Sequence, residues 1–176
     1  YSYRFYAFCY RILVTKVFKG HMINECVFDT PLARMLLKEK NGEIIHSTFT
    51  QKRINKTSNR TLIHAQKEIL EYFKGHRKVF TVKANPDGTH YQKKVWQQLL
   101  QIKYGSSKYY SDIAKDIASS PRAIGNACGA NKCLLIIPCH RVLSKDNSRS
   151  GYSSFGGLVH KDRLLELEKS DNIMLG

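Results

Sequence analysis

The chain has 176 residues, 42% of them hydrophobic, which suffices for one domain or two small ones and excludes wholesale disorder. Its 29 Lys and Arg residues against 14 Asp and Glu give a formal net charge of +15. Such a charge favours a polyanionic partner, with nucleic acid ranked first and an anionic membrane second. The alternative is a basic surface that serves only solubility. Five cysteines without a CxxC pair argue against a disulfide framework and favour a reducing compartment.

Residues 1–21 begin with the apolar segment YSYRFYAFCYRILV, which has the composition of a strand. Arg4 and Arg11 interrupt it and no small-residue cleavage site follows, so we do not expect a secretory signal. If Met22 is an internal start, residues 1–21 are an extension of the first domain. No apolar run reaches the roughly 18 residues of a transmembrane helix.

The first half of the chain has the pattern of a sheet followed by a helix. Two β-prone runs flank Asn41-Gly42, the dipeptide that best suits a type I′ hairpin turn. Residues 61–73 have helical spacing and end before Gly75, so we expect a helix that covers the sheet. Residues 79–84 predict one more strand. The turn cluster at 85–88 places the domain boundary there, giving domains at 1–85 and 86–176.

The second half is mainly helical in pattern. Residues 90–102 predict an amphipathic helix that ends before Gly105. A short helix at 111–118, a break at Ser119-Ser120 and a helix with Pro121 at its first position follow the order of a helix-turn-helix. A leucine-bearing amphipathic helix is expected near the end of the chain. The fold class is therefore α+β, with an N-terminal antiparallel sheet and a helical C-terminal domain.

Cys139, in the stretch LLIIPCHRV, has two interpretations. In the first, residues 134–137 form a buried strand and Cys139 fills a small gap, since free cysteine is among the most buried residue types. In the second, Cys139 is a nucleophile whose pKa is lowered by His140 and Arg141. Side chains of adjacent extended residues diverge, so the second interpretation requires Pro138 to turn the chain.

The segments that surround this cysteine favour the second interpretation. PCHRV preceded by LLIIP, with SPRAIGNACGAN before it and GGL and LLELE after it, resembles the O6-alkylguanine-DNA alkyltransferases. The resemblance is densest from Gly88 to Glu168 and covers roughly four-fifths of the chain. It implies an N-terminal domain of RNase H-like type and a protein that transfers an alkyl group from O6 of a flipped guanine in double-stranded DNA to its own cysteine. The resemblance also implies that each molecule acts once and needs no cofactor.

The same resemblance assigns roles to residues of the transfer site. It implies that Cys139 accepts the alkyl group, that His140 draws the thiol proton through a water, and that Asn131 braces the turn. A glutamate orients the histidine; counting from the Gly-Gly-Leu stretch places it at Glu168, with Glu166 as the rival. The two glutamates project to different sides of a helix, so both cannot serve.

Residues for binding DNA and the flipped base follow in the same way. Tyr110 matches the donor to the departing guanine, whereas Tyr109 is expected to pack. Arg122 matches the arginine that enters the base stack, and the helix-turn-helix is expected in the minor groove. The remaining candidates for contact with DNA or substrate are Ser111, Ser119, Tyr152, Ser153 and Ser154.

Departures from the family pattern leave some questions open. The loop SKDNSRSGYSSF is longer than usual, which leaves the range of alkyl groups and activity on O4-alkylthymine open. Cys128, Lys132 and Cys133 are interpreted as structural or surface residues. Cys9, Cys26 and His21 lack ligand spacing and His76 cannot be placed, so we predict no metal.

The predicted protein is an intracellular monomer that makes no membrane contact, in the nucleus of a eukaryote or the cytoplasm of a prokaryote. Three other classes are weighed: a lesion-binding relative that transfers nothing, a helix-turn-helix regulator, and a cysteine hydrolase. The lesion-binding relatives lack the acceptor cysteine. A regulator would bind undamaged DNA sequence-specifically. A cysteine hydrolase would need an oxyanion-stabilising element, and the sequence shows no clear one.

Overall fold

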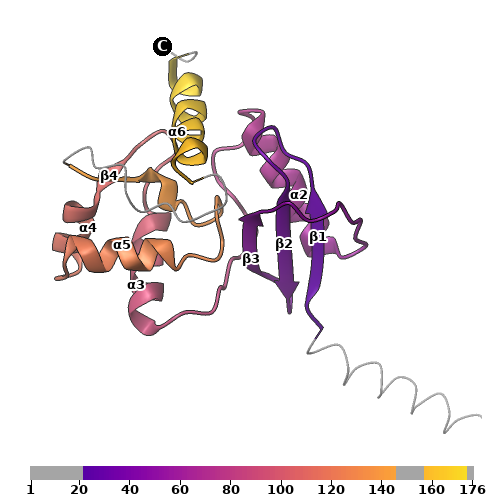
Figure 1. Cartoon of the computed structure of the whole chain (residues 1–176), viewed down its shortest axis with the longest axis horizontal. Helices are drawn as coiled ribbons and strands as arrows, with labels where there is room; N and C mark the ends of the chain where they lie inside the picture. Colours follow the sequence, from indigo (N-terminus) through magenta and orange to yellow (C-terminus); the bar gives the residue numbers. More distant parts are fainter. Residues whose placement is uncertain (1–21, 146–156, 174–176) are drawn as a thin grey trace, which may run out of the picture.

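The computed structural model describes residues 22–145 and 157–173. It is a mixed α+β structure that begins with an antiparallel sheet in the order β1 (Asn24–Phe28), β2 (Met35–Lys40) and β3 (Glu43–Phe49) (Figure 1). The turn between β2 and β3 has positive φ at Asn41 (55°) and at Gly42 (82°), as a type I′ turn requires. The predicted hairpin and the α+β class are therefore confirmed.

Helix α2 (Arg60–Phe73) covers one face of this sheet, as predicted. The Asn59 side chain caps it by accepting a hydrogen bond from the Leu62 N–H at 3.1 Å, and Gly75 follows its end with a φ of 74°, a conformation that favours glycine. Its inward face is apolar except for Glu68 and the Tyr72 hydroxyl; the buried residues are Leu62, Ala65, Glu68, Ile69 and Tyr72.

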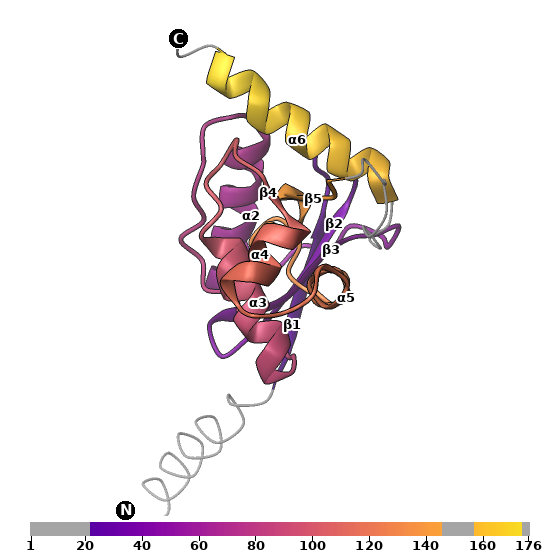
Figure 2. The ribbon, with the colours of Figure 1, turned by 90° about the vertical axis from the view of Figure 1, so that its left-hand side faces the viewer.

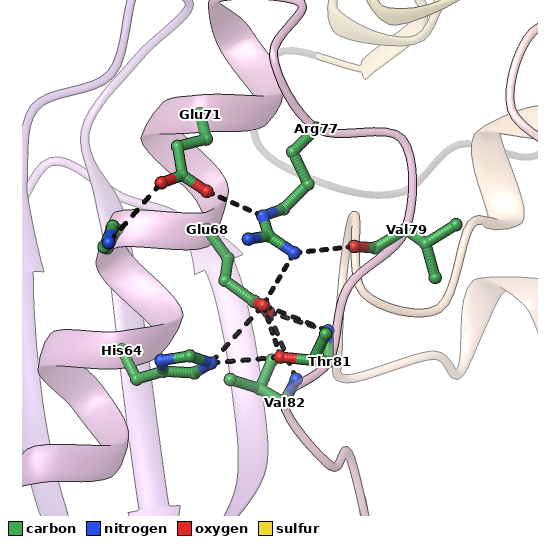
Figure 3. Close-up of polar contacts among 8 residues, drawn as sticks. His64, Glu68, Glu71, Arg77, Val79, Thr81 and Val82 are labelled. Atoms are coloured by element: carbon green, nitrogen blue, oxygen red, sulfur yellow. Dashed lines mark hydrogen bonds and ion pairs between the residues drawn. The ribbon is translucent and has the colours of Figure 1, made fainter.

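The strand predicted at residues 79–84 is wrong. Only Ala84 pairs with the sheet, through an isolated bridge to Ile44. The rest of the segment turns toward α2, where the buried Glu68 carboxylate accepts hydrogen bonds from the Thr81 and Val82 N–H groups at 2.9 and 3.1 Å (Figure 3). A carboxylate offers strong acceptors to a loop backbone, and here these bonds replace the ladder that the β-prone residues would otherwise form.

The second half contains helices α3 (His90–Leu100), α4 (Tyr110–Asp116), α5 (Pro121–Gly129) and α6 (Gly157–Ile173). Two short strands, β4 (Lys108–Tyr109) and β5 (Val142–Leu143), pair in parallel, and the 3-10 turn η2 (Cys139–Arg141) precedes β5. Helices α4 and α5 pack on each other, with α3 against α5. Pro121 is the first residue of α5, as predicted, and the Ser120 side chain caps the helix. The preceding helix spans 110–116 instead of 111–118.

The two halves meet along β3 and along α6. The backbone of Ser47 in β3 pairs with residues 132–134, donating to the Lys132 carbonyl at 2.8 Å and accepting from the Leu134 N–H at 3.0 Å. Helix α6 crosses one end of the molecule (Figure 2), with the His160 ring centroid 4.6 Å from that of Phe49. No described helix is long and apolar enough to cross a membrane.

Two other segments differ from the sequence-based expectations. Residues 134–137 form turns rather than a strand, with Leu135 at a φ of 68°. The buried side of α6 is largely polar instead of a leucine stripe: it consists of His160, Lys161, Leu164 and Glu168. A polar buried face needs partners inside the protein, and these partners form the candidate active site.

Candidate active site

Cys139 opens the η2 turn, where its side chain is buried with 4% of the residue exposed. Pro138, with ψ of 63°, turns the chain before it, so Cys139 and His140 are not extended neighbours. The Asn131 amide holds this turn from one side, donating to the Ile137 carbonyl at 2.9 Å and to Cys139 Sγ at 3.3 Å. Asn131 Oδ1 accepts from the Cys133 N–H at 2.9 Å. One amide therefore fixes both the loop and the sulfur.

His140 and Glu168 form a buried pair. The distance from His140 Nε2 to Glu168 Oε1 is 2.9 Å, and the two residues are 0% and 1% exposed. Arg141 completes the group with a two-pronged contact to the same carboxylate, from Nε to Oε2 at 3.0 Å and from a terminal nitrogen to Oε1 at 2.9 Å. Glu166, the rival carboxylate, is exposed.

The donors around Glu168 determine the tautomer of His140. Burial by itself would raise the pKa of Glu168, but hydrogen bonds from His140 and Arg141 hold it at about 2. Tyr72 donates to Oε1 at 2.8 Å and the Gly105 N–H donates to Oε2 at 3.0 Å. An ionised carboxylate can only accept, so His140 must carry its proton on Nε2. Nδ1 is then the basic nitrogen, and it is buried without a hydrogen-bond partner among the described residues.

Burial also dominates the ionisation of Cys139 and His140. It raises the pKa of the Cys139 thiol, an effect that the Asn131 hydrogen bond and the Lys161 charge oppose. It lowers the pKa of His140 despite the adjacent Glu168. The expectation that the neighbouring residues lower the thiol pKa is therefore wrong for this structure, because desolvation of the thiolate is the larger effect. Both groups are neutral at rest.

Lys161 belongs to this site, although the sequence analysis did not select it. Its ammonium group is buried, donates to the Val142 carbonyl at 2.7 Å and lies 5.8 Å from the centroid of the Tyr110 ring. Its charge acts on both Cys139 and Cys128. A lysine on a helix is usually solvated; the only sequence signal is its spacing of three and seven residues from Leu164 and Glu168 on one helix face.

The other predicted residues lie on or near α4 and α5. Burial raises the pKa of Tyr110, the half-buried first residue of α4, so its hydroxyl stays protonated. Arg122 is exposed at the start of α5. The Ser119 hydroxyl pairs with that of Tyr91 at 2.7 Å, and the Ser111 hydroxyl contacts Asp112 at 3.4 Å.

Tyr109, expected to pack, is 43% exposed. It lies in the exposed two-residue strand β4, and the Lys145 ammonium is 5.5 Å from its ring centroid. Tyr152, Ser153 and Ser154 lie outside the described residues, as do Cys9 and His21. The sequence predicts no metal site. The described part of the chain contains no group of three His, Cys, Asp or Glu residues that could hold a metal ion. The absence of a metal from the protein stays a prediction.

Comparison with known proteins assigns the family. Residues 90–170 match the family model described as 6-O-methylguanine DNA methyltransferase, DNA binding domain. The crystal structure of the O6-methylguanine methyltransferase of Mycobacterium tuberculosis matches with a TM-score of 0.76 at 30% identity, covering 85% of this chain and 94% of that one. The chain belongs to the methylated-DNA–protein-cysteine methyltransferase family. The predicted family is confirmed, and with it the predicted enzyme class, that of its named relatives.

Two further matches bear on the function. The inducible methylated-DNA–protein-cysteine methyltransferase of Bacillus subtilis (strain 168) is 49% identical over 104 residues, which are 58% of this chain and 57% of that protein. The chain thus aligns with little more than half of this relative's length. The structure of Mycobacterium tuberculosis OGT in complex with DNA matches at 32% identity and a TM-score of 0.71, covering 84% of this chain and 93% of that one.

Proposed function

We propose that this protein repairs alkylated DNA by moving the alkyl group of O6-alkylguanine onto Cys139. One observation carries the proposal: three groups meet at a single buried turn. They are the Cys139 thiol, the Asn131 amide that donates to it, and His140, which the ionised Glu168 carboxylate holds in place. His140 Nδ1 takes the thiol proton through a water as the sulfur attacks the alkyl carbon. An S–C bond forms as the C–O6 bond breaks, and guanine departs. No step of this proposal converts the thioether back to the thiol, so each molecule acts once.

The leaving guanine needs a donor because negative charge gathers on it as the C–O6 bond breaks. The Tyr110 hydroxyl suits this role, since its raised pKa keeps it protonated. Lys161, beside the Tyr110 ring, adds a positive charge that stabilises the thiolate as it forms. No step requires a cofactor.

For DNA binding we infer that α4 and α5 act as a helix-turn-helix in the minor groove. Arg122, exposed at the start of α5, is suited to fill the base stack when the damaged guanine turns into the protein. The formal net charge of +15 favours contact with phosphates at any sequence, as repair of scattered lesions requires. We further propose a monomer that works in the compartment holding the DNA; the RNase H-like character of the N-terminal half stays a prediction.

The decisive test is peptide mass spectrometry after mixing the protein with excess duplex DNA that contains one O6-methylguanine. We expect one methyl group per protein molecule, confined to the peptide that carries Cys139. The Cys139→Ser variant should bind the same DNA and acquire no methyl group. An unmodified wild-type peptide despite tight binding would make this a lesion-binding protein instead, and methyl transfer in the serine variant would exclude Cys139 as the acceptor.

The wedge role of Arg122 has its own test. Arg122→Ala should slow methyl transfer from duplex DNA about tenfold or more, because base flipping costs a few kcal/mol that the arginine helps to offset. Its reaction with the free base O6-benzylguanine should stay at the wild-type rate. Equal slowing with both substrates would show that Arg122 does not act through the DNA stack.

A further inference from the structure

Tyr72 connects the N-terminal half of the chain to the catalytic carboxylate. It lies on α2, is fully buried, and donates its hydroxyl hydrogen bond to Glu168 Oε1 at 2.8 Å, across 96 positions of sequence. Aromatic neighbours hold its ring, with centroids at 5.5 Å for Phe73, 5.5 Å for Phe80 and 5.8 Å for Tyr104. The hydroxyl therefore has one fixed direction.

The environment makes this hydroxyl a permanent donor. Burial and then the negative charge of Glu168 raise the pKa of Tyr72 far above its ordinary value, so the phenol does not ionise. The other charged or titratable groups that face the carboxylate are His140 and Arg141 from η2, and Tyr104 lies beside Tyr72. Oε1 thus accepts from Tyr72, His140 and Arg141, and Oε2 accepts from Gly105 and Arg141.

We propose that Tyr72 is a positioning residue for the alkyl transfer, through which the N-terminal half holds Glu168 in the orientation that keeps the His140 proton on Nε2 and presents Nδ1 to the thiol. This inference rests on the proposed function. Arg141 donates hydrogen bonds to both oxygens of the Glu168 carboxylate. The Tyr72 hydroxyl donates to Oε1 and comes from the N-terminal half of the chain. Without it, the carboxylate can tilt toward Arg141 and lengthen the contact to His140.

The test compares two variants that differ in what they remove. Tyr72→Phe deletes the hydroxyl and keeps the ring in its aromatic cluster. Phe73→Leu weakens that cluster and keeps the hydroxyl. For each full-length protein, nitrogen-15 NMR of labelled histidine reports the Nε2 proton of His140, single-turnover kinetics report methyl transfer, and thermal unfolding reports packing.

We expect Tyr72→Phe to shift the Nε2 proton resonance, to speed its exchange with water, and to slow methyl transfer about fivefold, because part of a hydrogen bond to a charged group is lost from the transition state. DNA affinity should not change. Phe73→Leu should lower the melting temperature and leave the resonance and the transfer rate as in the wild type.

An unchanged resonance and rate in Tyr72→Phe would overturn the inference and reduce Tyr72 to a packing residue. So would equal changes in Phe73→Leu, since packing alone would then account for them. Failure of the proposed function has a different signature: the wild-type protein itself would acquire no methyl group on Cys139.

Discussion

At the scale of single residues, buried charge governs the chemistry of this site. The Cys139 thiol lies where burial raises its pKa, and the two influences that oppose burial most are a hydrogen bond from Asn131 and the charge of Lys161. A low-dielectric site strengthens such contributions. We therefore expect the reactivity of the thiol to depend on Lys161, a residue outside the PCHRV motif.

Lys161→Met tests this dependence. The substitution keeps most of the side-chain volume and removes the positive charge, so the thiolate loses stabilisation and methyl transfer should slow about tenfold. Single-turnover transfer from O6-methylguanine in duplex DNA measures it. Lys169→Met, at an exposed position of the same helix, is the control and should react at the wild-type rate. A wild-type rate in Lys161→Met would mean that its ammonium group only serves the Val142 carbonyl.

Glu168 should make folding sensitive to acid. Its pKa falls from 4.5 to about 2 in the folded protein, so its stabilising contribution is complete above pH 4.5 and is lost as the pH falls toward 2. Glu168→Gln should lower the free energy of unfolding by on the order of 3 kcal/mol at pH 7, with the deficit shrinking below pH 4.5. Urea unfolding at pH 7, 4 and 2 measures the difference from wild type, and Glu166→Gln, at an exposed position, should show none. A deficit independent of pH would contradict the assigned ionisation.

At the scale of elements, Gly88 shows how a helix start is matched to its neighbours. It precedes Thr89, which caps α3 in a capping box with Gln92. A Cβ at position 88 would lie 2.4 Å from the Trp96 ring and 2.9 Å from Gln92 Oε1. The Trp96 ring cannot retreat, because it is buried and its Nε1 donates to the Ala127 carbonyl at 2.8 Å.

Gly88→Ala should therefore destabilise the protein by about 1–3 kcal/mol through overpacking. Gly125→Ala, in α5, makes a matched comparison with the opposite sign: a Cβ there meets nothing within 4 Å, and alanine should stabilise the helix by up to about 1 kcal/mol. Thermal unfolding of both variants measures the contrast. A stable Gly88→Ala protein would mean that the Trp96 ring can move.

Elements specified by local signals were predictable from the sequence. The hairpin at Asn41-Gly42 and the helix that begins at Pro121 follow from turn and cap chemistry that tertiary contacts do not override. The segment 79–84 failed because its β-prone residues are held by Glu68, a distant carboxylate that no local pattern reveals. Local propensity is a weak guide wherever a buried charge collects backbone donors.

The candidate site divides in the same way. Cys139, His140 and Asn131 lie in one short stretch whose motif identifies them, and counting along the chain led to Glu168. Lys161 was not predicted, because a lysine in a helical pattern normally faces water. Its assignment needed the three-dimensional packing of α6 against η2.

At the scale of the whole molecule, the sheet supports the loop that carries Cys139, the proposed acceptor. The backbone of Ser47 in β3 pairs with residues 132–134, and its buried hydroxyl donates to the Leu134 carbonyl at 2.6 Å. The predicted domain boundary at residue 85 remains a prediction. These contacts cross it, so the N-terminal sheet and the active-site turn should open together.

Ser47→Ala tests that coupling. It removes the hydroxyl donor to the Leu134 carbonyl, which still accepts from the Ile136 N–H at 2.9 Å. The loss should therefore cost about 0.5–1.5 kcal/mol of stability and loosen the turn that Asn131 and Cys133 organise. Hydrogen exchange should quicken at the amides of residues 134–137 and of Cys139, on the far side of the predicted boundary. Thr48→Ala is the matched control, because within the described ranges its hydroxyl donates only to the adjacent Phe49 carbonyl, at 3.4 Å. Exchange in the turn should then stay as in the wild type. If Ser47→Ala accelerated exchange only within β3, the sheet would support itself alone, and the active-site turn would owe its rigidity to the C-terminal half.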